Sequence, residues 1–168
     1  MEKYYVSYNH IHRIMKELAD QVKESGFEPD YIVAIGTGGF IPARMLKTNI
    51  NRPILTVGIA YYDLNDNLMD RPNIIQWIDN ADAKLKGKKI LLVDEVDDSR
   101  ATIGYCLETL LTHDPEEIAV VVVHNKEKEK RGAIPPEVKK YFAGETMNDK
   151  WICYPWDADD IEDHDRYC

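Results

Sequence analysis

A run of acidic and hydroxyl residues follows an apolar segment near the middle of the chain. The apolar residues 91–93 lead into four acids within residues 94–98, and Ser99 and Thr102 follow. An apolar-periodic segment begins there, so the pattern predicts a buried strand, a loop and a helix N-terminus. Free backbone N–H groups and the positive dipole end at such a terminus suit a phosphate. The acidic segment (residues 94–102) is therefore predicted to hold a phosphate and a divalent cation together.

The residue types in the acidic segment indicate separate tasks. Asp94 and Glu95 suit the two hydroxyls of a sugar diol or Mg²⁺, and Asp98 suits proton exchange with a substrate. Ser99, Thr102 and the N–H groups between them suit a monophosphate. The alternative is an ordinary acidic turn with Asp98 or Ser99 as the N-cap. Four neighbouring acids repel one another unless something compensates them, which favours a functional site.

A second candidate is the glycine loop (residues 36–39), which contains Thr37, Gly38 and Gly39. It lies between the apolar run 31–35 and a helical pattern that begins with Phe40. Strand, glycine loop and helix in succession form the first half of a βαβ unit. A glycine-rich tetrapeptide alone is weak support for phosphate binding, and a plain tight turn is the alternative.

The elements that must position these residues alternate along the chain. Helical spacing of apolar residues predicts a helix over 11–22 and another after Thr102. Strands are predicted at 31–35, 54–60, 73–78, 88–94, 118–123, 141–143 and 151–154, with a mobile, turn-rich loop between Tyr61 and Pro72. The alternation indicates one α/β domain over residues 1–168, with a mainly parallel twisted sheet flanked by helices. Both candidate loops follow strands, where ligands of such sheets bind.

Composition excludes several classes of function. The chain has 168 residues with 44% hydrophobic and 30% charged residues and a net charge of -9, which disfavours nucleic-acid binding. Its apolar runs are shorter than the ~20 residues of a membrane span, so no membrane partner is expected. The three cysteines form no CxxC pair, and the first residues lack a signal-peptide layout. A cytoplasmic location is the expectation.

The acidic segment also carries a family resemblance. Residues 91–102 read Leu-Leu-Val-Asp-Glu-Val-Asp-Asp-Ser-Arg-Ala-Thr, which resembles the 5-phosphoribosyl-1-pyrophosphate (PRPP) signature of type I phosphoribosyltransferases. Ser99 replaces the usual Thr and Arg100 the usual Gly, and the resulting Asp-Asp-x-Arg-x-Thr form is similar to that of the fungal hypoxanthine-guanine enzymes. Arg100 could add a charged donor to the phosphate. The resemblance implies that Asp94, Glu95, Asp98, Ser99, Arg100, Ala101 and Thr102 bind ribose and 5′-phosphate.

The same resemblance assigns the glycine loop and the flexible segment after Tyr61. Thr37, Gly38 and Gly39 would bind pyrophosphate, with a strained or cis peptide at Thr37–Gly38. The segment between Tyr61 and Pro72 would be the catalytic loop that closes over the site, with Tyr61 replacing a usual Ser.

Residues 150–157 resemble the purine-binding hood of 6-oxopurine phosphoribosyltransferases, especially the bacterial xanthine-guanine type. By this resemblance Trp151 stacks on the purine, the Ile152 backbone bonds its edge, and Asp157 binds Mg²⁺ on the pyrophosphate. Lys126 matches the lysine that donates to purine O6, which favours 6-oxo over 6-amino purines. The hood is expected to form from about residues 135–168. The alternatives are a core role for Trp151 and a solvated charge for Lys126.

The resemblance implies transfer of the 5-phosphoribosyl group from PRPP to N9 of hypoxanthine, guanine or xanthine. IMP, GMP or XMP and pyrophosphate would be the products, with Asp98 as the catalytic residue for the N7 proton. Mg²⁺ would be the cofactor, near Asp94, Glu95 and Asp157, and the assembly a homodimer or homotetramer. The sequence does not rank the three bases.

Some residues and functions remain open. Arg44 has no assigned role, Arg71 and Arg166 are either pyrophosphate contacts or surface residues, and Trp77 and Trp156 are expected to pack. The alternative functions are a phosphoribosyltransferase for another base, a PRPP-binding regulatory module of the same fold, and an unrelated Mg²⁺-dependent phosphohydrolase.

Overall fold

The computed structural model describes residues 1–65 and 67–168. In chain order, its helices and strands are β1 (Lys3–Tyr5), α1 (Tyr8–Glu24), β2 (Tyr31–Gly36), α2 (Phe40–Asn49), β3 (Ile54–Tyr62), β4 (Leu68–Gln76), α3 (Ala81–Leu85), β5 (Lys89–Asp97), α4 (Ala101–Leu111), β6 (Glu117–Glu127), β7 (Lys140–Asn148), β8 (Trp151–Cys153), the 3₁₀ turn η1 (Pro155–Asp157) and α5 (Ile161–Asp165).

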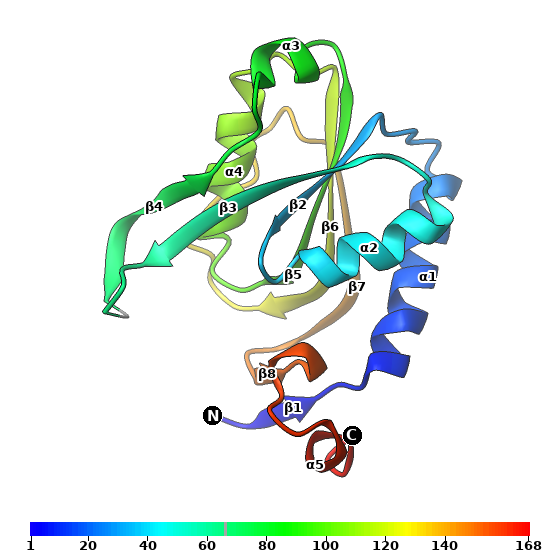
Figure 1. Ribbon diagram of the computed structural model, residues 1–168, viewed down its shortest axis with the longest axis vertical. Helices are drawn as coiled ribbons and strands as arrows, with labels where there is room; N and C mark the ends of the chain where they lie inside the picture. The colour runs from blue at the N-terminus through cyan, green and yellow to red at the C-terminus, as the bar shows by residue number, and fades with distance from the viewer. Residues whose placement is uncertain (66) are drawn as a thin grey trace.

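A six-stranded sheet in the order β4-β3-β2-β5-β6-β7 forms the centre of the fold (Figure 1). All neighbouring strands in it are parallel except the antiparallel pair β3–β4. The prediction of an α/β fold with a mainly parallel sheet is confirmed. The strand order changes direction between β2 and β5. From β2 the chain adds β3 and β4 toward one edge of the sheet, and it then returns to β5 on the other side of β2. Such a switch point opens a crevice at the carboxyl ends of the strands.

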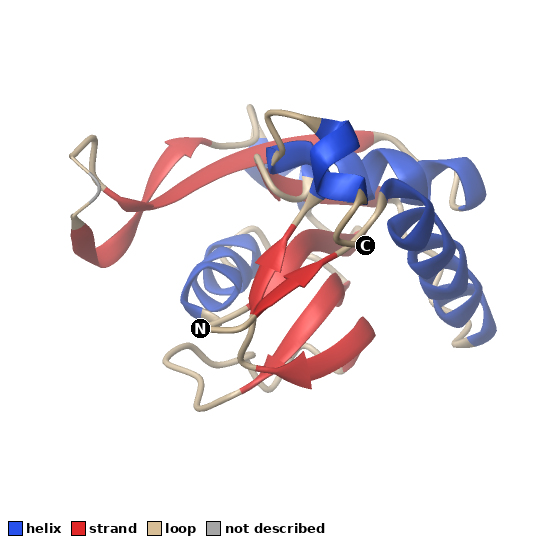
Figure 2. Cartoon of the chain, turned by 90° about the horizontal axis from the view of Figure 1, so that it is seen from below, coloured by secondary structure: helices blue, strands red, loops and turns tan. Residues whose placement is uncertain are grey.

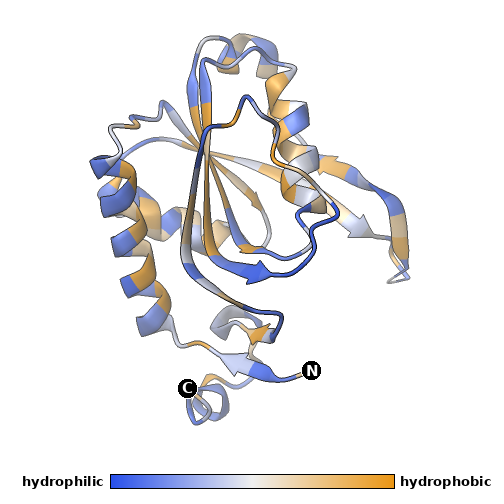
Figure 3. Cartoon of the chain, turned by 180° about the vertical axis from the view of Figure 1, so that it is seen from behind, coloured by the Kyte–Doolittle hydropathy of each residue, from blue (hydrophilic) through white to orange (hydrophobic). Residues whose placement is uncertain are grey.

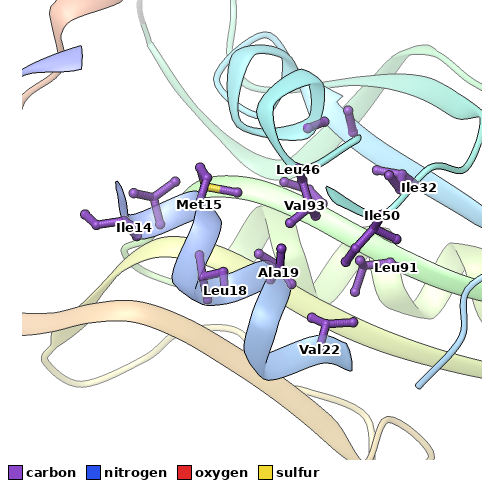
Figure 4. Packing of buried hydrophobic residues seen from close by; sticks show 14 of the residues in the cluster. Ile14, Met15, Leu18, Ala19, Val22, Ile32, Leu46, Ile50, Leu91 and Val93 are labelled. Carbon is purple, nitrogen blue, oxygen red and sulfur yellow. The ribbon is translucent and has the colours of Figure 1, made fainter. Parts of the chain in front are cut away.

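The sheet is covered on both faces, as a parallel sheet requires. On one face α1 and α2 pack on alternate strand residues, among them Leu91 and Val93 (Figure 4). On the other face α3 and α4 pack on the residues between, such as Leu92 and Val120. The two cores fix the direction in which every strand residue points. They therefore determine which side chains reach the crevice.

Helix α1 shows why the local sequence folds as it does. Its predicted apolar positions are all buried, namely Ile11, Ile14, Met15, Leu18, Ala19 and Val22. Its hydrophilic residues lie on the outer side (Figure 3). The Ser7 side chain caps the helix by accepting a hydrogen bond from the His10 N–H at 3.1 Å. Just beyond the end, Gly26 has φ of 80°, which a glycine adopts without strain.

Among the described residues, no helix is both long and apolar enough to span a membrane.

The region predicted as a loop between Tyr61 and Pro72 is instead a β-hairpin, so that prediction was wrong. Strand β3 continues to Tyr62, and β4 begins at Leu68 and pairs with it. The hairpin projects away from the rest of the sheet (Figure 2). Pro72 lies inside β4, which is possible because β4 is an edge strand with one unpaired side. Residue 66 lies outside the described residues.

Strand β5 is also longer than predicted. It runs to Asp97, and Asp94 and Asp97 still pair with Val122 and Asn125 of β6. The acids therefore extend the strand, and the connection to α4 is confined to residues 98–100. Backbone pairing with a long neighbouring strand outweighs the low strand preference of acidic residues.

The second, smaller sheet consists of β1 and β8, which pair in parallel. The expected hood over residues 135–168 thus differs from the structure in two ways. Strand β7 belongs to the main sheet, and the N-terminal strand β1 joins the C-terminal part. The main-chain N–H of Trp151 also donates to the Glu2 carbonyl oxygen at 2.9 Å.

Candidate active site

The glycine loop and the acidic segment meet at the carboxyl ends of the neighbouring strands β2 and β5. They enclose a cavity of about 420 Å³. Predicted site residues that line it are Thr37, Gly38, Asp94, Glu95, Asp98, Ser99, Arg100, Ala101 and Thr102, together with Tyr61. Gly39 lies beneath the cavity, where an added Cβ would be 2.5 Å from the Val93 carbonyl oxygen. Because only glycine fits there, α2 can begin directly against β5.

The glycine loop contains a cis peptide bond between Gly36 and Thr37. The expectation of an unusual peptide in this loop is confirmed, but its position was predicted one residue too late. Gly38 packs against the acidic segment, since an added Cβ would be 2.5 Å from the Glu95 carboxyl carbon. The loop backbone therefore approaches Glu95 directly.

The turn before α4 has the geometry of an anion site. Arg100 precedes the helix with φ of 66°, a left-handed conformation in which glycine is usual. The Ala101 N–H faces the Ser99 hydroxyl oxygen at 3.3 Å. A second segment supports the turn, because the N–H groups of Arg131 and Gly132 donate to the Ser99 carbonyl oxygen. The N-terminus of an 11-residue helix thus opens on the cavity, as phosphate binding requires.

The Arg100 side chain is engaged elsewhere. Its Nε and Nη2 donate to Asp97 Oδ2 at 3.0 and 2.7 Å, and its guanidinium lies 5.4 Å from the centre of the Tyr141 ring. The Tyr141 hydroxyl donates to the same Asp97 oxygen at 2.7 Å. Asp97 is fully buried, so these partners compensate its charge. Arg100 therefore stabilises the turn through its contacts with Asp97 and Tyr141. This geometry does not support its predicted donation to a phosphate.

Lys130 holds the opposite side of the turn. Its Nζ lies 2.7 to 3.1 Å from four oxygens, the main-chain carbonyls of Asp97, Asp98 and Lys126 and the Asn125 side chain. Burial lowers its pKa, and the neighbouring Asp97 acts against that shift. The roles of Lys130 and Asp97 could not be predicted from the sequence, because they depend on contacts between segments about 30 residues apart.

Lys126 and Asp98, which the family resemblance assigns to neighbouring purine atoms, lie together. Lys126 is 6% exposed, and its Nζ lies 3.5 Å from Asp98 Oδ1 and 3.3 Å from Asp149 Oδ1. Lys128 contacts the same two acids at 2.8 and 3.2 Å. Its ammonium group lowers the pKa of Asp149, mainly through this hydrogen bond. Asp149 and Lys128 were not identified from the sequence, where they read as ordinary surface charges.

The two first acids of the segment have raised pKa values. Burial raises the pKa of Asp94 to about 8 and that of Glu95 to about 7. The negative charges of Glu95 and Asp97 add to the shift of Asp94, and that of Asp157 to the shift of Glu95. Carboxyl groups with such shifts gather at functional sites, where a cation or a donor compensates the charge.

Residues 151–157, called the hood segment below, carry the remaining predicted residues. Trp151, Ile152 and Asp157 line a second cavity of about 520 Å³, together with Tyr5 and the buried His164. Trp151 is 60% exposed, so the alternative of a core residue is wrong. This cavity and that of the acidic segment have no lining residue in common among the described residues.

Trp156 and Tyr154 connect the hood segment to the acidic segment. The Trp156 Nε1–H donates to Glu95 Oε2 at 2.9 Å, and the Tyr154 hydroxyl donates to the Glu95 carbonyl oxygen at 3.3 Å. Tyr154 Oη also lies 2.8 Å from Nδ1 of the buried His124. Trp156 packs as expected, with its ring stacked on Tyr154. Its hydrogen bond to Glu95 was not foreseen.

The three arginines with open roles lie outside the cavity of the acidic segment. Arg44 donates to Thr48 along α2, Arg71 is exposed on the edge strand β4, and Arg166 lies 3.6 Å from Asp163. Trp77 donates its indole N–H to His113 Nε2 at 3.0 Å, also away from this cavity.

The carboxylates fit a magnesium ion that is shared with a phosphorylated substrate. In many enzymes Mg²⁺ takes one or two carboxylates from the protein and further oxygens from substrate phosphates. Within residues 1–65 and 67–168, no group of three or more histidine, cysteine or acidic side chains is arranged to hold a metal ion alone. Asp94, Glu95 and Asp157 offer hard oxygen donors of the type that Mg²⁺ requires.

Comparison with known proteins gives concordant matches. A family model described as a phosphoribosyl transferase domain matches residues 6–160. Hypoxanthine-guanine phosphoribosyltransferase of Schizosaccharomyces pombe is 40% identical, with 97% of this chain and 93% of the relative aligned. Xanthine phosphoribosyltransferase 1 of Saccharomyces cerevisiae is 38% identical over the same shares. A crystal structure of a hypothetical protein from Neisseria gonorrhoeae with bound ppGpp has a TM-score of 0.92 and 45% identity, covering 99% of this chain and 95% of that one.

Proposed function

This chain belongs to the phosphoribosyltransferase family, and we propose that it is a purine salvage enzyme that transfers the 5-phosphoribosyl group of PRPP to N9 of a 6-oxopurine. The purine would be hypoxanthine, guanine or xanthine, and the products would be the nucleoside monophosphate and pyrophosphate. The two yeast relatives are named for 6-oxopurine substrates, which supports this substrate class.

The observation that carries the proposal is the pairing of Lys126 with Asp98 beside the phosphate turn. O6 and N7 are neighbours on one edge of a 6-oxopurine. A lysine ammonium and a carboxylate 3.5 Å apart match that edge, since the lysine donates to O6 and the acid exchanges the N7 proton. A 6-amino group would present a donor to Lys126, which disfavours adenine.

The other roles are assigned from the residues that line the two cavities. Ser99, Arg100, Ala101 and Thr102 would bind the 5′-phosphate at the start of α4, with Arg100 contributing through its main chain. Asp94 and Glu95 would accept from the ribose hydroxyls. The glycine loop, Thr37 to Gly39, would hold the pyrophosphate. Trp151 and Ile152 would bind the purine from the hood segment, which brings a flat aromatic face to a flat base.

Cleavage at the anomeric carbon develops positive charge on the ribose, as in glycoside hydrolysis. Asp94, Glu95 and Asp157 would hold Mg²⁺, which would neutralise charge on the departing pyrophosphate. Within the chain, Asp98 would manage the purine proton, and Asp94 and Glu95 would face the ribose. The β3–β4 hairpin, which begins beside the cavity at Tyr61, would exclude water during the transfer.

Pyrophosphate release tests the proposal. The protein is incubated with PRPP and Mg²⁺ and, in turn, with hypoxanthine, guanine, xanthine and adenine. Release with at least one 6-oxopurine and none with adenine is expected. Release with adenine alone would favour the rival of a transferase for another base. PRPP binding without pyrophosphate release in the presence of any base would favour the regulatory module. Release of inorganic phosphate from simple phosphoesters would favour the phosphohydrolase.

A second candidate function is binding of ppGpp, which the Neisseria gonorrhoeae structure contains. ppGpp is a guanine nucleotide with two diphosphate groups, so the proposed purine and phosphate sites offer it suitable partners. We expect ppGpp to inhibit competitively with PRPP. Inhibition that leaves the KM for PRPP unchanged would place any ppGpp site elsewhere.

We further propose that residues 1–168 act as one catalytic domain in the cytoplasm, with small-molecule substrates and no nucleic-acid or membrane partner. A homodimer or homotetramer is the proposed assembly. Light scattering coupled to gel filtration measures it, and a monomeric mass at working concentration would contradict the proposal.

A further inference from the structure

Two other parts of the chain contact Glu95. Its own strand, β5, carries it to the cavity, and the glycine loop packs against its carboxyl group at Gly38. From the hood segment, the Trp156 Nε1–H donates to its Oε2 at 2.9 Å. Tyr154 adds a hydrogen bond to its main-chain carbonyl oxygen. One side chain thus lies between the proposed pyrophosphate loop and the purine-binding segment.

Trp156 is itself held in a single orientation. Its ring is stacked on Tyr154, with centroids 4.7 Å apart and planes within 7°. Tyr154 is 4% exposed, and its hydroxyl is fixed by His124 at 2.8 Å. Because stacking already restricts the Trp156 ring, the side chain loses no further conformational entropy when its indole N–H donates to Glu95. The Glu95 carboxyl group thus accepts from a donor whose ring is restrained by stacking on Tyr154.

We propose that Trp156 is a positioning residue, which holds the Glu95 carboxylate against the glycine loop and so makes PRPP binding depend on the hood segment. Trp156 acts through Glu95 and need not touch the substrate. The proposal rests on the proposed function, since it takes PRPP as the ligand of this cavity. The simpler alternative is that Trp156 only packs on Tyr154.

The substitution Trp156→Phe separates these two roles. Phenylalanine keeps the stacked ring and removes the N–H donor. If Trp156 positions Glu95, the Kd for PRPP measured by calorimetry and the KM for PRPP should both rise about tenfold, the size expected for a hydrogen bond to a charged group. The KM for the purine should change less than about threefold. If Trp156 only packs on Tyr154, Trp156→Phe should change the KM for PRPP and the KM for the purine by the same factor.

The chain contains a matched control. Trp77 donates its indole N–H to His113 at 3.0 Å and lies outside the cavity. Trp77→Phe makes the same chemical change and is expected to leave the Kd for PRPP within twofold of the wild type. If the two variants show equal Kd values for PRPP while the wild type releases pyrophosphate, the positioning role is overturned and the proposed function stands.

A double-mutant cycle keeps the test valid if Trp156→Phe also lowers stability. Glu95→Ala removes the group through which Trp156 would act. Adding Trp156→Phe to Glu95→Ala should then weaken PRPP binding less than twofold further. A second full tenfold loss in the Glu95→Ala background would show that Trp156 acts independently of Glu95, which refutes the proposal. Absence of PRPP binding by the wild type would instead refute the proposed function.

Discussion

At the residue scale, the charges that would meet the purine already neutralise one another. Asp98 and Asp149 share Lys126 and Lys128, with nitrogen-to-oxygen distances of 2.8 to 3.5 Å. Lys126 is the buried member, and an unpaired ammonium at that depth would be costly. A purine that accepts a hydrogen bond from Lys126 would therefore replace part of an existing ion pair. Asp149, 3.3 Å from the Lys126 ammonium, holds the lysine in place in the meantime.

Asp98→Asn should reduce turnover by about 10² or more, because the amide cannot take up the purine proton. The Kd for PRPP should change less than about threefold, since the phosphate turn remains. Steady-state pyrophosphate release and calorimetry measure the two effects. Asp82→Asn, at the exposed contact with His113, serves as the control. Turnover at the wild-type rate in Asp98→Asn would contradict the catalytic role.

Trp151→Ala should raise the KM for the purine about tenfold or more, because stacking on an aromatic ring contributes about 1–3 kcal/mol per base. The KM for PRPP should stay nearly constant. Trp151→Phe retains a flat ring and should recover most of the purine affinity. Equal increases in both KM values would argue against stacking.

At the element scale, the sequence predicted the parts of the fold that depend on local apolar patterns. Helix α1 and the buried strands β2, β5 and β6 were identified because each buries a clear stripe or run. The β3–β4 hairpin was predicted only in part, because strands were expected at 54–60 and 73–78 but a loop was expected between Tyr61 and Pro72. No residue of β4 is buried, so only its pairing with β3 defines the first half of that strand.

The phosphate turn shows the same limit within the site. Sequence indicated the turn itself but not its supports, because these come from other elements. Gly132 is the clearest case, since an added Cβ would lie 2.1 Å from the Arg100 carbonyl oxygen. Asp97 and Lys130 are further supports that no local pattern distinguishes from surface charges.

Gly132→Ala should therefore displace the turn. Forced overpacking of this kind costs about 1–3 kcal/mol, which corresponds to several degrees of melting temperature. The affinity for PRPP should fall together with the melting temperature. Thermal unfolding and calorimetry are the measurements. Gly58→Ala is the matched control, because an added Cβ there meets nothing closer than 3.5 Å. A Gly132→Ala variant with unchanged affinity would show that the turn adapts.

At the scale of the whole molecule, a buried histidine connects the main sheet to the hood segment. His124 of β6 lies 2.8 Å from the Tyr154 hydroxyl and 3.4 Å from Oε2 of Glu145 of β7. His10 of α1 contacts the other Glu145 oxygen. Burial lowers the pKa of His124 to about 4, although the charge of Glu145 acts in the opposite direction. The histidine is therefore neutral in the folded protein near neutral pH.

This predicts a specific acid sensitivity. Between pH 6.5 and about 4 the unfolded chain binds a proton on His124 that the folded chain does not, so stability falls as the pH falls through that window. A shift of this size corresponds to a loss on the order of 3 kcal/mol. His124→Asn should be less stable at pH 7 but lose less stability on acidification. The free energy of unfolding measured in urea at pH 7, 6, 5 and 4 tests it, with the exposed His12→Asn as control. Parallel pH profiles for His124→Asn and the wild type would contradict the prediction.

The small sheet has a consequence for the order in which the molecule can be made. β1 pairs with β8, so Lys3 lies beside Trp151. During synthesis on a ribosome, the N-terminal strand emerges first and has to wait until almost the entire chain has followed before its partner exists. Closing so long a loop is a late and slow step in folding. The six-stranded sheet and its phosphate turn can form earlier, so a nascent chain would acquire its phosphate-binding half before its base-binding half.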